Sequence, residues 1–188
     1  YVDLATNQLT PLATDLKWDV EGIDLSKDGK TLAFAVNEAG MSKVYLLDTA
    51  SRRARPVTGV HNGIIGALSW HQNSRDLAFS MASARSTSDV YSLDASTGAV
   101  TRWTEGELGG LVASELSEPE LIRWKSFDGL EISGFYYKAP QRFTGKRPVI
   151  INIHGGPEGQ SRPSFIGRNN YFLNELGVSI IYPNVRGS

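Results

Sequence analysis

The sequence of 188 residues contains no cysteine. Disulfide bonds, thiolate metal sites and a cysteine nucleophile are therefore excluded together, while the compartment stays open because exported proteins can also lack cysteine. A large net charge is missing too, since 19 basic residues balance 20 acidic ones and the net charge is −1. Without a basic surface, neither nucleic acid nor an anionic membrane is expected as a partner.

Long apolar runs are also absent from the sequence. No stretch approaches the ~18 consecutive apolar residues of a membrane helix, and the first residues do not have the pattern of a signal peptide. We therefore expect a soluble protein, either cytoplasmic or periplasmic. Because the sequence begins at Tyr1 rather than at methionine, any targeting segment would already have been removed.

Motifs for cofactors and metals are missing as well. Neither G-x-G-x-x-G nor the phosphate loop G-x-x-x-x-G-K-[ST] occurs, so no nucleotide cofactor is expected. The three histidines, His61, His71 and His154, do not have the spacing of a zinc site. We therefore expect neither a cofactor nor a metal ion.

The chain does contain a repeat. Leu32-Ala33-Phe34 recurs 45 residues later as Leu77-Ala78-Phe79, and Val44-Tyr45 recurs 46 residues later as Val90-Tyr91. The opening segment matches residues 47–58 at nearly the same spacing. The sequence therefore holds three partial copies of one unit.

This repeat predicts blades of a β-propeller. A period near 45 residues, short strands and turn signals at Asp28-Gly29 and Asn73-Ser74 are typical of four-stranded blades. We expect residues 1–116 to form two to three blades. A closed ring needs about four blades or more, so the chain is expected to be truncated at its N-terminal end. The tryptophans recur at similar intervals and are expected in the blade cores: Trp18, Trp70, Trp103 and Trp124.

The pattern changes from about Ser117 onwards. A strand, a turn at Phe127-Asp128-Gly129 and a second, alternating strand from Leu130 to Tyr137 open this part of the chain. The apolar run Val149–Ile153 follows and is typical of a strand buried on both faces.

A helix and a further strand complete this second part. Residues 169–177 have helical apolar spacing and end in Gly177, a residue type suited to a helix C-terminus. Residues 178–182 form another apolar run. Strand, helix and strand make a βαβ unit, so residues 117–188 are expected to begin an α/β sheet.

The run Val149–Ile153 leads directly into His154-Gly155-Gly156-Pro157. In an open parallel sheet, catalytic groups gather beyond the C-terminal ends of the strands. Consecutive glycines let backbone N–H groups reach a ligand, and a donor aimed at an oxyanion contributes about 3 kcal/mol to acyl transfer. The alternative is a tight turn in which the glycines only supply positive φ angles.

Several segments together resemble the prolyl oligopeptidase family of serine peptidases, in particular its acylaminoacyl-peptidase and dipeptidyl-peptidase-like branch. They are the propeller repeats followed by SFDGLEISGFYY, RPVIINIHGGPEGQ and NYFLNELGVSIIYPNVRGS. The resemblance covers essentially the whole chain. It implies a β-propeller followed by the N-terminal part of an α/β-hydrolase fold, and hydrolysis of short peptide substrates through an acyl-enzyme.

The resemblance also implies roles for four residues. The backbone N–H of Gly156 would belong to the oxyanion hole, with Gly155 shaping the loop. His154 stands where some relatives carry an oxyanion-assisting tyrosine, and we expect it to support the loop rather than to take part in the chemistry. Arg186 is expected to brace the active-site loops through backbone carbonyls or a carboxylate, because a planar guanidinium suits that task.

A serine nucleophile is missing from the chain. The motif G-x-S-x-G does not occur, and the nearest match, residues 159–163, fails at its last position. The resemblance places the serine, acid and histidine of the triad after Ser188. The chain alone should therefore be inactive, truncated at both ends and in need of the remainder of the same catalytic domain.

Two alternatives to a peptidase stay open. Nothing in the chain reads the leaving group, so a carboxylesterase on the same scaffold fits equally well. A propeller binding module with an inert hydrolase-like part is the non-enzymatic alternative. The oligomeric state is not predicted.

Overall fold

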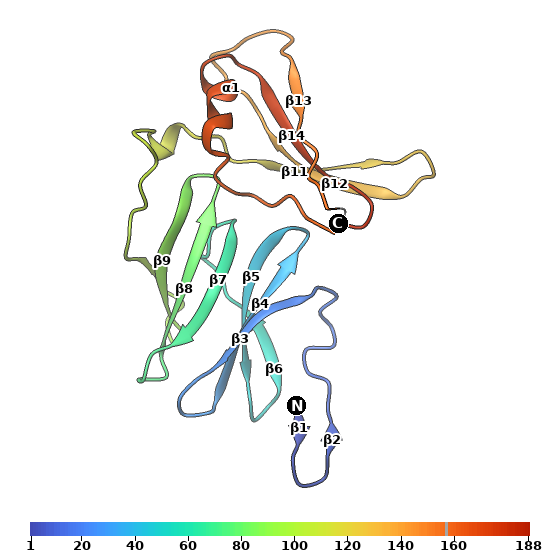
Figure 1. The fold of residues 1–188 in the computed structure, drawn as a ribbon. Helices are drawn as coiled ribbons and strands as arrows, with labels where there is room; N and C mark the ends of the chain where they lie inside the picture. Colours follow the sequence, from blue (N-terminus) through green and yellow to red (C-terminus); the bar gives the residue numbers. More distant parts are fainter. Residues whose placement is uncertain (157) are drawn as a thin grey trace. The chain divides into compact units, whose positions relative to one another are not determined.

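The computed structural model describes residues 1–156 and 158–188, and the chain is mostly β-sheet (Figure 1). It divides into two compact units. The first unit comprises residues 1–61, 65–80 and 90–103, and the second comprises residues 62–64, 81–89 and 104–188. The division into propeller and hydrolase parts after residue 116 remains a prediction.

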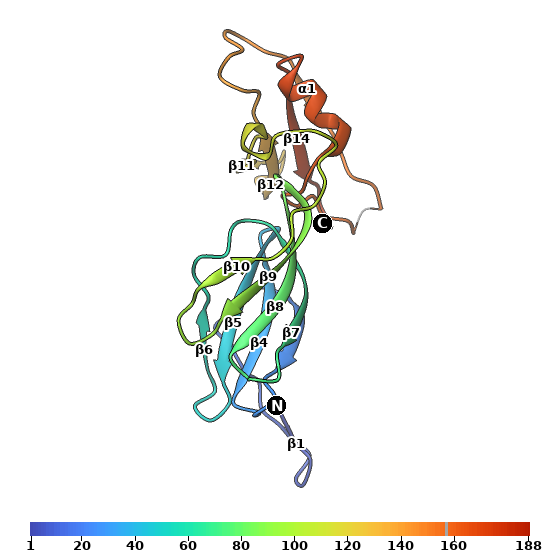
Figure 2. The same cartoon turned by 90° about the vertical axis from the view of Figure 1, so that its left-hand side faces the viewer.

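Two four-stranded sheets follow one another along the chain, and both can be followed in Figure 2. In each sheet, strands that are consecutive in the sequence are neighbours, so the repeated four-stranded meander predicted from the sequence is confirmed. The first sheet consists of β3 (Val20–Leu25), β4 (Thr31–Glu38), β5 (Met41–Asp48) and β6 (Arg53–Pro56). The second consists of β7 (Ile64–Trp70), β8 (Asp76–Ser83), β9 (Ser86–Asp94) and β10 (Val100–Arg102), and a short hairpin of β1 (Val2–Asp3) and β2 (Gln8–Leu9) precedes both.

Equivalent aromatic pairs lie on the two sheets. Phe34 stacks on Tyr45 with ring centroids 5.3 Å apart, and Phe79 stacks on Tyr91 at 5.6 Å. Both pairs join neighbouring strands, where stacked rings add to the stability gained by burial. The repeat in the sequence is therefore a repeat in packing.

The turns at Asp28-Gly29 and Asn73-Ser74 lie where the sequence predicts them, between β3 and β4 and between β7 and β8. Gly29 has a φ of 73° and Ser74 a φ of 55°, both in the left-handed region. Glycine adopts this region without steric cost. In the first turn, the Asp28 carboxylate also accepts the backbone N–H of Lys30 at 3.1 Å, which stabilises the turn.

The prediction that the tryptophans fill blade cores is right for Trp70 and wrong for two others. Trp70 is 3% exposed, and its backbone N–H donates to the Asp24 carboxylate at 2.6 Å. Trp18 and Trp103 are 43% and 68% exposed, because they lie outside the strands, before β3 and after β10. Trp124 is partly buried.

The second unit holds a mixed four-stranded sheet in the order β11-β12-β14-β13. β12 is antiparallel to both β11 and β14, whereas β13 and β14 are parallel. The chain crosses from β13 to β14 through a short helix, so the predicted strand–helix–strand unit is present. The elements are η1 (Ala113–Glu115), β11 (Glu120–Lys125), β12 (Glu131–Tyr137), β13 (Val149–Ile151), η2 (Gly167–Asn169), α1 (Asn170–Asn174) and β14 (Ser179–Asn184).

The predicted bounds of three elements in this unit are wrong. β13 ends two residues early, α1 ends three residues before Gly177, and β14 begins one residue late and runs two residues further than predicted. The longer β14 is possible because Gly134 of β12 faces Pro183. A Cβ at Gly134 would lie 2.9 Å from the Pro183 Cα, so only glycine admits the proline at this position in the pairing.

β13 forms the edge of the sheet, and β14 lies inside it. Val149 and Ile151 are 47% and 64% exposed, whereas Ile180 of β14 is 1% exposed. The expectation that the first apolar run is buried on both faces is therefore wrong within this chain. Among the described residues, no helix is long and apolar enough to cross a membrane.

Candidate active site

The loop after β13, residues 154–160, is called the glycine loop here and lies beyond the ends of the parallel strands; Pro157 is outside the described residues. Gly156 has a φ of 86°, which glycine adopts without steric cost. Its carbonyl accepts the Glu158 N–H at 2.7 Å, whereas its own amide has no hydrogen-bond partner in the described part of the chain. A Cβ at Gly155 or Gly156 would meet no atom within 4 Å. The loop thus presents an available backbone donor.

Gly159 is a further loop residue that the sequence analysis did not single out. A Cβ at this position would lie 2.9 Å from the Gly155 carbonyl oxygen and 3.1 Å from Nδ1 of His154. The loop therefore folds back on itself so closely that a larger residue would displace it. Three glycines within five residues were the available signal in the sequence.

His154 is half-buried and contacts two groups through its ring. Nδ1 lies 3.1 Å from the Gly155 carbonyl oxygen, and Nε2 lies 2.9 Å from Oγ of Ser188. Because a carbonyl oxygen only accepts, Nδ1 is the donor in the first contact. The Ser188 hydroxyl has one proton and faces two acceptors, Nε2 of His154 and the Val185 carbonyl oxygen. The carbonyl occupies the place that a carboxylate takes in a catalytic triad, so His154 and Ser188 do not complete one.

Arg186 follows β14 and contacts the turn between β11 and β12. Its guanidinium donates to the Asp128 carboxylate and lies 5.2 Å from the ring centroid of Phe127. The Arg186 contact, followed by the Leu130 backbone N–H, lowers the pKa of Asp128. A carboxylate is one of the two kinds of partner expected for Arg186.

Asn184 and Ser161 form a buried pair that sequence reasoning missed. The Ser161 N–H donates to Oδ1 of Asn184 at 2.7 Å, and Nδ2 of Asn184 donates to the Ser161 carbonyl at 3.2 Å. Both residues are less than 10% exposed. The pair fixes the residue that follows the glycine loop to the last residue of β14. A polar residue ending an apolar strand was the only signal in the sequence.

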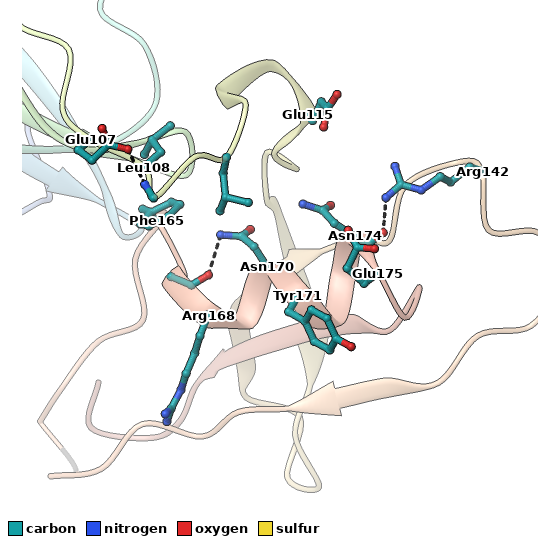
Figure 3. Close-up of a pocket in the computed structure, with 13 residues that line it drawn as sticks. Glu107, Leu108, Glu115, Arg142, Phe165, Arg168, Asn170, Tyr171, Asn174 and Glu175 are labelled. Carbon is teal, nitrogen blue, oxygen red and sulfur yellow. Dashed lines mark hydrogen bonds between the residues drawn. The ribbon is translucent and has the colours of Figure 1, made fainter.

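A second feature of this unit is a hollow of about 570 Å³ beside α1 (Figure 3). Arg142 donates to the Asn174 carbonyl at its rim, and the Glu107 carboxylate accepts the Gly109 N–H at 2.8 Å. None of the described residues that line it is a serine, histidine or cysteine. The hollow therefore offers no serine, cysteine or histidine nucleophile among the described residues. Likewise, no group of three or more metal-binding side chains gathers among the described residues.

Neither a protein-family model nor a curated protein sequence matches the chain. Solved structures do match. A prolyl endopeptidase aligns with 100% of the chain at a TM-score of 0.77 and 17% identity. Acylaminoacyl peptidase from Pyrococcus horikoshii aligns with 96% at a TM-score of 0.71 and 25% identity, and puromycin hydrolase with 97% at 0.80 and 21%.

The chain spans only 28%, 27% and 29% of these three proteins, respectively. Each match nevertheless includes nearly the whole chain, so the repeated sheets and the mixed sheet occur in the same order in the matching structures. The resemblance predicted from the sequence is thus confirmed at the level of fold: this chain shares its fold with part of the peptidases of the prolyl oligopeptidase family.

Proposed function

We propose that this chain supplies the oxyanion loop of a serine peptidase that hydrolyses short peptides through an acyl-enzyme. The observation that carries the proposal is the backbone N–H of Gly156, which has no hydrogen-bond partner among the described residues and lies, at a positive φ angle, beyond the ends of two parallel strands. A preorganised donor of this kind stabilises the oxyanion that develops on the substrate carbonyl. The three structures named above, which are two peptidases and a hydrolase, support the same reaction class.

The mixed sheet is proposed to be the beginning of an α/β-hydrolase domain. Its order β11-β12-β14-β13, with one parallel pair joined through α1, supports this assignment. The serine, acid and histidine of the triad would then follow Ser188. Residues 1–116 would be propeller blades that restrict access to the site, which fits a preference for short peptides.

Within this proposal, Gly155 shapes the loop, and His154 and Arg186 support it. The His154 ring bonds Gly155 and Ser188, and Arg186 bonds Asp128, so each side chain joins two loops. No metal ion or cofactor has a part in this chemistry.

The test uses the complete protein with an aminoacyl-nitroanilide, a short acyl ester and the Gly156→Ala variant. Alanine is strained by about 1–2 kcal/mol at a φ of 86°, so the backbone turns and the N–H moves away. We expect kcat for the nitroanilide to fall about 100-fold with little change in KM, because one oxyanion donor is lost.

Gly145→Ala is the matched control. Gly145 has a φ of 77° and open space around it, but lies in the loop between β12 and β13. It should suffer the same strain without loss of kcat. Turnover of the ester alone would favour a carboxylesterase, and no turnover by the wild type would favour a binding module.

A further inference from the structure

Three polar side chains at the end of β14 and just after it contact three different parts of the second unit. Asn184 contacts Ser161, Arg186 contacts Asp128, and Ser188 contacts His154. Residues 184–188 are called the brace here. The side chains that make these contacts are two residues apart, but the chain does not continue as a strand: residues 186 and 187 form a turn, with Gly187 at a φ of 84°.

The brace holds both ends of the glycine loop. At the far end, Asn184 donates to and accepts from the backbone of Ser161, which makes a two-point contact with fixed geometry. Because Asn184 is only 7% exposed, water does not compete for these hydrogen bonds. At the near end, the hydroxyl of Ser188 meets Nε2 of His154 at 2.9 Å.

His154 connects Ser188 to the backbone of the glycine loop. Its other ring nitrogen, Nδ1, bonds the Gly155 carbonyl oxygen, which belongs to the peptide group whose N–H is that of Gly156. A peptide group is planar, so a contact that fixes the carbonyl also fixes the direction of the N–H. Ser188 is therefore connected to the proposed oxyanion donor through a single side chain.

The brace is itself held by the turn between β11 and β12. Arg186 forms an ion pair with Asp128, and its guanidinium lies 5.2 Å from the ring centroid of Phe127, which remains 95% exposed. Ser188 is further tied back to its own turn, since its backbone N–H donates to the Val185 carbonyl at 3.0 Å. The β11–β12 turn, the brace and the glycine loop lie at the same end of the strands and are thus connected one to the next.

We infer that Ser188 and Asp128 are positioning residues that set the direction of the Gly156 N–H through His154 and Arg186. The inference rests on the proposed function, which gives that N–H its role. It adds that contacts within the glycine loop do not fix this direction alone. The brace completes the geometry of the loop, and it approaches the loop only after β14 has paired.

The decisive variant is Ser188→Ala in the complete protein, with Ser188→Thr as the conservative partner. Ser188 is exposed, so its loss should leave the thermal midpoint unchanged. We expect Ser188→Ala to lower kcat about tenfold at a nearly constant KM, because a mispositioned donor loses part of its effect on the transition state. Ser188→Thr keeps the hydroxyl and should keep most of kcat.

Asp128→Asn tests the other end of the series and has a close control. Asp28 and Asp128 occupy equivalent Asp-Gly turns, in which each carboxylate accepts the N–H two residues on. Of the two carboxylates, only that of Asp128 also contacts an arginine among the described residues. Asp128→Asn should therefore lower kcat about threefold, whereas Asp28→Asn should leave it unchanged.

A second measurement separates this inference from the proposed function. Amide hydrogen exchange of the peptide covering residues 152–162 should be about tenfold faster in Ser188→Ala and unchanged in Ser188→Thr. Unchanged exchange in Ser188→Ala would overturn the inference even if the protein is an active peptidase. If exchange is faster in Ser188→Ala but the wild type has no hydrolase activity, the positioning role would be supported and the peptidase refuted.

A covalent probe supplies the last outcome. A fluorophosphonate that labels Ser188 itself would show that this serine is a nucleophile, and the positioning role would be overturned. Labelling at a serine outside the chain, with the kcat loss described for Ser188→Ala, would support it.

Discussion

Tyr137 shows how one buried hydroxyl organises the segment between the glycine loop and α1. The ring is 1% exposed, and its hydroxyl donates to the Ser164 carbonyl at 2.8 Å. The Ser164 N–H in turn donates to the Tyr137 hydroxyl oxygen at 3.1 Å. Burial raises the pKa of the Tyr137 phenol, so the group stays protonated and keeps its donor at every physiological pH.

Replacement of this hydroxyl is the first prediction at the residue scale. Tyr137→Phe removes the partner of two backbone groups of Ser164 at once and should lower the free energy of unfolding by about 1–3 kcal/mol. Tyr136→Phe is the control, because the Tyr136 hydroxyl makes one longer contact, 3.2 Å to Ser179. Urea titrations of both variants measure the difference, and an equal loss in the two would contradict the prediction.

Single residues also show what the sequence could reveal about the site. The glycines and Arg186 stand out because their residue types suit backbone exposure and bidentate contacts. Asn184 and Ser161 do not stand out, since they are 23 positions apart and meet only after β14 has paired with β12 and β13. Contacts of this kind depend on tertiary structure, and no local pattern encodes them.

At the scale of elements, the repeated hairpins share an aspartate that caps the turn. Asp3, Asp48 and Asp94 each accept backbone N–H groups two or three residues further along. The backbone N–H groups of Thr6 and Ala5 lower the pKa of Asp3. The pKa values of Asp48 and Asp94 are lowered first by the hydroxyls of Ser51 and Ser96, respectively, and then by backbone N–H groups. The turns therefore favour the ionised carboxylate.

Acid should loosen these turns, and the sign follows from the direction of the shift. A pKa that is lower in the folded state than the ~3.9 of an unfolded aspartate gives stability that is complete above that value. It is lost as the pH falls through the folded pKa. We therefore expect the double variant Asp48→Asn/Asp94→Asn to lose less thermal stability than the wild type between pH 5 and pH 2. Identical acid profiles would refute this role.

The elements also differ in how well their ends can be predicted. Strand identity in the repeats follows from alternating apolar residues and turn residues, which act over a few positions. The end of α1 does not, because it is set by the Val178 N–H, which donates to the Phe172 carbonyl, and by Gly177 at a φ of 61°. Of the apolar residues in this stretch, Leu173 is fully buried, whereas Tyr171 and Leu176 are 57% and 44% exposed.

At the scale of the whole molecule, the exposed edge strand distinguishes this chain from a larger protein that contains it. β13 combines unpaired backbone groups at the sheet edge with Val149 and Ile151, which are 47% and 64% exposed. An apolar edge of this kind promotes pairing with other chains. The proposed hydrolase domain would cover it with a further strand.

The prediction compares Ile151→Lys in two settings. In the 188-residue chain, a lysine at this exposed position should leave the fold intact and reduce self-association, measured by sedimentation velocity. In the complete protein, the same change would bury a charge against the neighbouring strand and cost several kcal/mol.

Ile180→Lys provides the comparison, because Ile180 is 1% exposed on the inner strand β14 and its replacement should unfold the second unit in both settings. The difference between the two positions reports what covers β13, independently of any enzymatic activity. If Ile151→Lys were tolerated equally well in the complete protein, β13 would be a true edge. The sheet would then end where this chain ends it, and the assignment to a larger hydrolase domain would fail.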